Sequence, residues 1–117
     1  MDCSLVMVVG ELAKEPELRT LESGSVLAVL TLRVKPDDDR RAMSLPVTMW
    51  DPPPWVAELH SGTRVVVSGR VVRRFYALAG GRASRVEVVA EHIANAGDRR
   101  ARAKVRRAVE QVLDSVA

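Results

Sequence analysis

Aromatic side chains are scarce in this sequence of 117 residues, which has one Phe, one Tyr and two Trp. Cysteine occurs once, as Cys3, so there is no disulfide framework to indicate export. No apolar run approaches the roughly 20 residues that a bilayer-spanning helix needs, and the N-terminus has neither a basic region nor a cleavage pattern. These absences favour a cytoplasmic protein that does not bind membranes.

The residue patterns of catalytic and metal sites are missing as well. No Gly-x-Ser-x-Gly nucleophile motif occurs. The acidic run Asp37–Asp39 lacks the spaced ligands and the glycine of a calcium loop. His60 and His92 are far apart, and with a single cysteine they define no zinc site. We therefore predict a protein that is not an enzyme and has no metal and no cofactor.

An excess of charge of one sign is also absent from most of the chain. The net charge is +3, but residues 98–117 alone hold six basic and three acidic side chains. Subtracting these from the chain totals of 18 and 15 leaves 12 of each sign for residues 1–97. Because the first 97 residues are neutral, bulk charge does not by itself indicate a nucleic-acid partner.

Short β-rich runs dominate the first 93 residues. Three prolines, a short helical turn around 56–59 and Gly62 separate the third run from the fourth, and an Ala-Leu-Ala-Gly-Gly turn joins the last two into a long hairpin. Residues 14–25 read as a turn. Five strands with a helix after the third predict an all-β fold, the five-stranded Greek-key barrel called the OB-fold. The predicted strands cover residues 4–12, 26–35, 44–50, 63–76 and 84–93.

The remaining residues, 98–117, predict a basic amphipathic helix beyond an OB-fold domain at 1–97. Asp98 is placed as the N-cap. An apolar stripe recurs at helical spacing and needs a surface to cover it. That surface is either the protein's own barrel or an interface between subunits, and we expect the interface. The stripe consists of Val105, Ala108, Val109, Val112, Leu113 and Val116.

The segment Val-Met-Val-Val-Gly-Glu-Leu-Ala-Lys-Glu-Pro-Glu-Leu-Arg at 6–19 resembles the opening pattern of bacterial single-stranded DNA-binding proteins. Further matches follow in order, namely SGSVLAVLTL, VTMW, HSGTRVVVSGRV and RVEVVAEHI. The resemblance covers residues 4–93. It implies an OB-fold, a role without catalysis, and a homo-oligomer, more often a tetramer than a dimer.

The chain departs from the family's pattern in three places. Ser44 stands where the family has an aromatic residue, and Pro46 where it has a basic one. The loop before them holds Asp37–Asp39 instead of basic or aromatic residues. The chain ends in Leu-Asp-Ser-Val-Ala, without the acidic tip with which family members recruit protein partners. That recruitment is not expected here.

Binding a single strand without sequence preference needs aromatic rings for bases and cations for phosphates. Trp50 matches a family position at which a ring stacks on a base. We expect Val65, Val67 and Val71 to be buried, so the alternate residues of the same strand face a groove. A bulge after Gly69 would exchange the faces of the residues beyond it. The predicted binding residues are Arg33, Lys35, Thr48, Trp50, Arg70, Arg74 and Tyr76.

Other roles stay open for the rings. Trp50 at a strand end is also placed to cap the barrel, and Phe75 and Trp55 are expected to pack in the core or against a helix. The sequence predicts sequence-independent binding of single-stranded DNA in replication, repair or recombination. The alternative is an OB-fold oligomeric scaffold that has lost strand affinity and acts through protein contacts. A remoter one is an OB domain of a nucleic-acid enzyme complex that supplies no chemistry.

Overall fold

The structure is a computed structural model that describes residues 4–37 and 41–116. The lone cysteine Cys3 and the acidic residues Asp38 and Asp39 therefore lie outside the described residues. Within those residues no helix is both long and apolar enough to cross a membrane.

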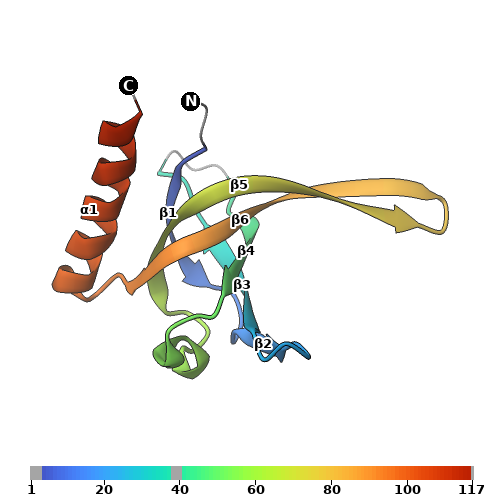
Figure 1. Cartoon of the computed structure of the whole chain (residues 1–117), viewed down its shortest axis with the longest axis horizontal. Helices are drawn as coiled ribbons and strands as arrows, with labels where there is room; N and C mark the ends of the chain where they lie inside the picture. The colour runs from blue at the N-terminus through green and yellow to red at the C-terminus, as the bar shows by residue number, and fades with distance from the viewer. Residues whose placement is uncertain (1–3, 38–40, 117) are drawn as a thin grey trace.

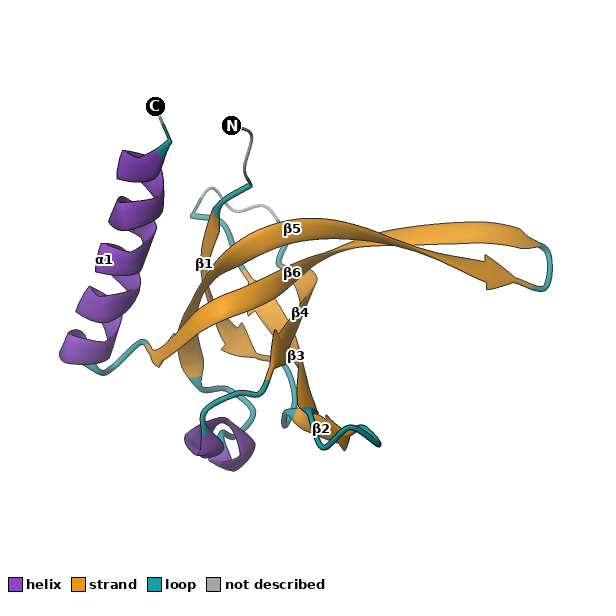
Figure 2. Ribbon diagram, in the orientation of Figure 1, coloured by secondary structure: helices purple, strands orange, loops and turns teal. Residues whose placement is uncertain are grey.

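Most strand pairs are antiparallel, and the strands close into a barrel (Figures 1 and 2). The sheet order is β1-β5-β6-β4-β3-β2, and pairing of β1 with β3 at Glu11 and Leu12 closes it. One contact, between β4 and β6, is parallel. The elements are β1 (Val6–Leu12), β2 (Glu17–Thr20), β3 (Val26–Val34), β4 (Met43–Trp50), the 3-10 helix η1 (Pro54–Glu58), β5 (Arg64–Leu78), β6 (Gly81–Asn95) and α1 (Arg99–Ser115).

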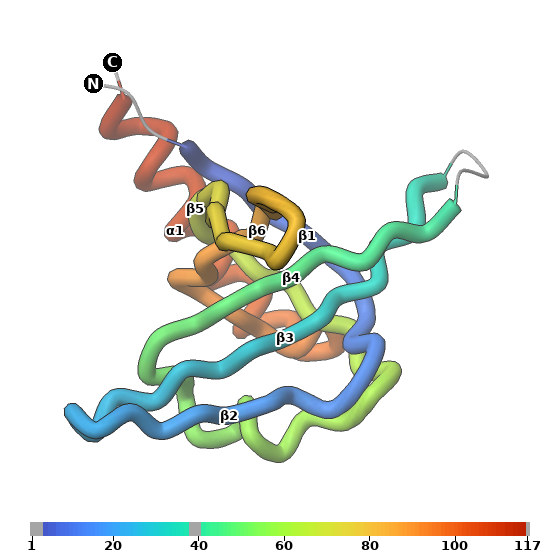
Figure 3. The backbone as a smooth tube through the Cα atoms, turned by 90° about the vertical axis from the view of Figure 1, so that its right-hand side faces the viewer, coloured from blue at the N-terminus to red at the C-terminus, as the bar shows by residue number. Residues whose placement is uncertain are grey.

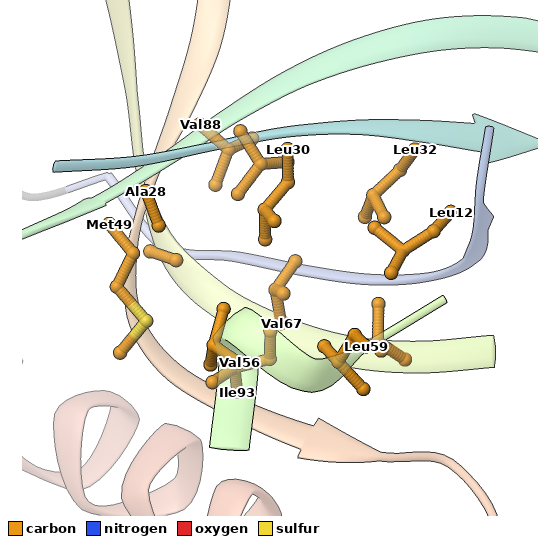
Figure 4. Close-up of a cluster of buried hydrophobic side chains, with 13 residues drawn as sticks. Leu12, Ala28, Leu30, Leu32, Met49, Val56, Leu59, Val67, Val88 and Ile93 are labelled. Carbon is orange, nitrogen blue, oxygen red and sulfur yellow. The ribbon is translucent and has the colours of Figure 1, made fainter. Parts of the chain in front are cut away.

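The barrel interior is filled by aliphatic side chains at alternate positions of β1, β3, β4 and β5, as alternation along a half-buried strand requires, and by Val88, Ala90 and Ile93 of β6. On β3 the buried residues are Ala28, Leu30 and Leu32, as the sequence pattern predicts. On β5, Val65 and Val67 are completely buried. Val56 of η1 closes one end of the cluster, and Figure 4 shows these side chains converging between the strands. Trp50, Phe75 and Trp55 do not belong to this core.

Strand β2 was not predicted, because residues 14–25 read as a turn. All four of its residues are exposed, so it carries no alternation of buried and exposed positions. It pairs with β3 from Thr20↔Val26 to Glu17↔Val29, across a turn in which Gly24 adopts a φ of 90°. The barrel therefore has one strand more than expected, while the fold class is the one predicted.

The β5–β6 hairpin is much longer than the barrel needs and projects from it as an arm (Figure 1). Val71 and Phe75 on this arm are 41% and 72% exposed, so the expectation that they are buried is wrong. The register shifts between Ser68 and Gly69, but the extra residue is Glu91 on β6. The parity of β5 is therefore unbroken, and the exchange of faces that a bulge on β5 would cause does not occur.

Helix α1 begins after Asp98, whose side chain accepts a hydrogen bond from the Ala101 N–H at 3.1 Å. Its Val105 is 3% exposed and packs against Val66 of β5 and Ala94 of β6. The first half of the helix thus packs on the chain's own barrel and not across a subunit interface as expected, because the outward face of β5 and β6 supplies an apolar surface there. Leu113, in the second half, is exposed.

Candidate nucleic-acid interface

The outward face of the sheet is continuous from β2 to the β5–β6 arm. Across β3, β4 and β6 the register sets Val29 opposite Thr48 and Thr48 opposite Val89, and Arg70 of β5 completes this row. Strands β2, β3 and β4 run side by side in Figure 3, with the arm reaching toward the viewer above β4. The arm therefore borders the outward face along the β4 side (Figure 3).

A groove of about 360 Å³ lies on this face between the arm and β2. We call it the outer groove. Polar and basic side chains from four elements line it, and Pro46 and Val29 form apolar parts of its wall. Its full lining is Lys14, Glu17, Arg19, Val29, Leu30, Thr31, Ser44, Pro46 and Arg85.

Two predicted rings stand exposed on the outward face. Trp50, at the end of β4, is 46% exposed. The next residue, Asp51, has a φ of 47°, and its amide and carboxylate bond the backbone of Val26 at 2.7 and 2.9 Å. These two hydrogen bonds hold the end of β4 against β3 and so fix the backbone position of Trp50.

Tyr76 is 45% exposed and lies far out on the arm. It pairs with Ala83, whereas Thr48 pairs with Val89. The two partners on β6, Ala83 and Val89, are six residues apart, or roughly 20 Å at about 3.3 Å per residue. Trp50 and Tyr76 are therefore on one face but do not contact the same base.

Most cations of the outward face already have an acidic neighbour. Arg33 bonds Glu11 at 3.3 Å, across the β1–β3 pair. Arg70 approaches Glu91 at 4.0 Å. Lys14 and Arg19 both contact Glu17, at 3.4 and 3.5 Å. Most cations of the outward face are thus balanced by carboxylates beside them, in exposed ion pairs that are weak individually.

Arg74 is paired more deeply, with Glu87. Glu87 is completely buried, and its Oε1 accepts from Arg74 Nε, while its Oε2 has no hydrogen-bond partner within the described residues. The Thr48 hydroxyl is buried on the same face and also lacks a partner there. A buried carboxylate requires a nearby cation, so the first role of Arg74 is to balance Glu87.

The predicted residues share the outward face but spread along it. Thr48 and Arg70 lie in one row of the register, and Trp50 lies two residues farther along β4. Arg33 and Arg74 lie four residues from this row, along β3 and β5. Tyr76 lies out on the arm, and Lys35 lies just beyond the end of β3, at the opposite end from Trp50.

Sequence reasoning missed Arg85, Lys14 and Arg19, which line the outer groove. Arg85 is exposed and forms no ion pair with the residues that the structure describes. Alternation along β6 carried the signal for it, since Arg85, Glu87 and Val89 share the parity opposite to Val88. Arg19 was not identifiable without β2.

The closed β-barrel, with exposed rings and cations on its outward face, places the protein in the OB-fold class. Residues 3–95 match the sequence model of the single-strand binding protein family, and the chain belongs to that family. No curated protein sequence matches it. Helix α1 lies outside the matched segment.

Among solved structures, the chain is similar to a deletion mutant of the single-stranded DNA binding protein from Thermus aquaticus. The identity is 26% and the TM-score 0.66, over 79% of this chain and 40% of that one. The chain therefore matches less than half the length of that protein. The match confirms the OB-fold predicted from the sequence.

Proposed function

We propose that this protein binds single-stranded DNA without sequence preference and acts in DNA replication, repair or recombination. The observation that carries the proposal is the exposed ring of Trp50 on the same sheet face as the outer groove, whose Arg85 has no acidic partner within the described residues. Family membership supports the class of ligand.

In this proposal bases stack on Trp50 and Tyr76, and phosphates meet cations of the outer groove. A stacked base contributes about 1–3 kcal/mol, so two rings account for most of the affinity. Arg85 supplies a charge that no carboxylate neutralises within the described residues. Arg33 and Arg70, on the same face, contribute less because each has an acidic neighbour, and Lys35 contributes less because it lies beyond the end of β3.

The protein also assembles with copies of itself, as a tetramer in preference to a dimer, and works in the cytoplasm without catalysing a reaction. An open strand edge supports the assembly, since among the described residues Val6–Gly10 pair with β5 alone. Met7 and Val9 on this strand are exposed apolar side chains. Light scattering measures the mass, and a monomer at micromolar concentration would refute this part.

Titration of the tryptophan fluorescence with oligo-dT at two salt concentrations tests the function. Quenching is expected, with an affinity that falls only moderately as salt rises, because most cations of the face are already paired. Trp50→Phe and Trp50→Ala serve as a matched pair. Alanine is expected to cost about 1–3 kcal/mol in binding, and phenylalanine less, with little change in melting temperature because the ring is exposed. No quenching at low salt would refute the proposal.

One observation favours the second candidate, an oligomeric scaffold that acts through protein contacts. Phe75 and Leu78 are exposed apolar side chains near the tip of the arm. A scaffold would keep its assembly and show no response to oligo-dT, so the same titration separates the two functions.

A further inference from the structure

A second groove, distinct from the outer groove, lies between α1 and the segment that leads from β4 into η1. Its volume is about 300 Å³, and we call it the α1 groove. Trp55 of η1 lines it and is 37% exposed, although the residue after it, Val56, is completely buried in the barrel. The lining consists of Met49, Pro53, Trp55, Glu91, His92, Ile93, Ala101, Lys104 and Val105.

The α1 groove begins where the outward face of the sheet ends. Val47 and Val88 are partners in the parallel β4–β6 register, so Trp50 lies at about the level of Glu91, which lines the groove. A chain leaving the ring of Trp50 toward α1 therefore meets Trp55 next. The sequence interpretation assigned Trp55 to packing, but its exposed area faces this groove.

Cations of α1 border the α1 groove on one flank of the helix. Lys104 lines it directly, and Arg100 and Arg107 lie four residues before and three after Lys104, hence on the same side of the helix. All three are exposed, and none forms an ion pair with the described residues. The acidic lining residue, Glu91, is next to Arg70 at 4.0 Å.

We infer that the α1 groove is a second subsite for single-stranded DNA, in which Trp55 stacks on a base and Arg100, Lys104 and Arg107 contact phosphates. This rests on the proposed function, because the strand reaches the α1 groove from Trp50. An exposed ring beside unpaired cations is the combination that binds a single strand without sequence preference. Polyanionic DNA suits the three cations, which add to Arg85, the cation lining the outer groove that has no acidic partner within the described residues.

The two tryptophans allow each subsite to report separately. Trp50→Phe leaves Trp55 as the single tryptophan and keeps a ring at position 50, and Trp55→Phe does the converse. Each variant is titrated with dT oligomers from about 4 to about 30 nucleotides, which bracket the site sizes of OB folds. Binding itself is followed by the anisotropy of a dye on the DNA. Quenching of Trp55 is expected only above a threshold length, and quenching of Trp50 at all lengths that bind.

The cations are tested by two triple variants of α1 with equal loss of charge. Arg100→Ala, Lys104→Ala and Arg107→Ala together change the flank at the α1 groove. Arg99→Ala, Arg102→Ala and Arg106→Ala together form the control, because their spacing places them on another side of the helix. The first triple is expected to lower the salt slope for long oligomers by about 2, since each phosphate contact on a single strand contributes about 0.7. The control triple is expected to leave that slope unchanged.

Trp55→Ala is expected to weaken binding of long oligomers roughly 5-fold to 150-fold and to leave short ones unaffected, with Trp55→Phe restoring most of the loss. Melting curves of both variants show whether the fold is kept, and Trp55→Phe preserves the test if alanine unfolds the protein. Binding by the wild type, with no quenching of Trp55 and equal slopes for the two triples, would overturn this inference alone. Failure of the wild type to bind any oligomer would overturn the proposed function with it.

Discussion

The pair of Arg74 and the buried Glu87 makes a sharp prediction about what Arg74 does. Arg74→Ala removes the cation and leaves a carboxylate in a site that water does not reach. Loss of one partner from a fully buried ion pair costs about 3–5 kcal/mol. Because the Arg74 side chain is 53% exposed, solvent screens its charge and the cost is smaller. We expect Arg74→Ala to lower the free energy of unfolding by about 2–3 kcal/mol, or Tm by roughly 10 °C or more.

Glu87→Gln keeps the shape of the side chain and removes its charge, so its expected cost is about 1 kcal/mol or less. The double variant is expected to be about as stable as Glu87→Gln alone. Urea or thermal unfolding of the four proteins then yields a coupling energy of about 2 kcal/mol. A melting temperature of Arg74→Ala equal to that of the wild type would refute this reasoning.

The same four proteins separate charge balance from phosphate contact. In Arg74→Ala the bound DNA strand lies near the unbalanced negative charge of Glu87, so this variant is expected to bind DNA more weakly. The double variant is neutral at this site and is expected to bind with the wild-type salt slope. If the double variant instead binds as weakly as Arg74→Ala, with a slope lower by about 0.7, then Arg74 contacts a phosphate directly.

Three further changes have expected outcomes. Arg85→Ala is expected to lower the salt slope of oligo-dT binding by about 0.7 with an unchanged melting curve, and an unchanged slope would remove Arg85 from the interface. Gly69→Ala places a Cβ 1.9 Å from the Val89 carbonyl oxygen and is expected to destabilise the protein by several kcal/mol. In the control variant Gly80→Ala, the added Cβ meets nothing within 4 Å. Equal melting temperatures of the two variants would contradict the close approach at Gly69. Val105→Ala is expected to cost about 2 kcal/mol in unfolding free energy and the exposed Leu113→Ala less than about 0.5, and a reversed order would show that α1 packs through its other half.

The sequence was sufficient for the strands whose alternation reflects burial. In β3 and in the first half of β5, alternate residues are core residues in both the pattern and the structure. Asp98 was recognisable as an N-cap because the signal is local. Strand β2 and the exposure of Val71 were not predictable, because they depend on which segment lies beside them and on where the arm leaves the barrel.

The candidate site was predictable in its rings more than in its charges. A residue's face follows from parity, which placed Arg74 on the outward side, and Trp50 was assigned from its match to a family position. Whether a cation is available depends on a partner distant in sequence, as Glu11 is from Arg33 and Glu87 from Arg74. No pattern within a single strand shows these pairs.

The strand order has a consequence for how the chain folds as it is synthesised. β6 is the last barrel strand to leave the ribosome, yet it lies in the middle of the sheet, between β5 and β4. Until residue 95 has emerged, β5 and β4 each present an unpaired edge, and the sheet stays open between them although β1 joins β5 to β3, a state prone to wrong pairing. The β5–β6 hairpin brings β6 to the edge of β5 by contacts local in sequence, which form faster than distant ones. The closing step of folding is therefore the insertion of β6 between β5 and β4, and α1, made last, then covers β5 and β6 at Val66 and Ala94.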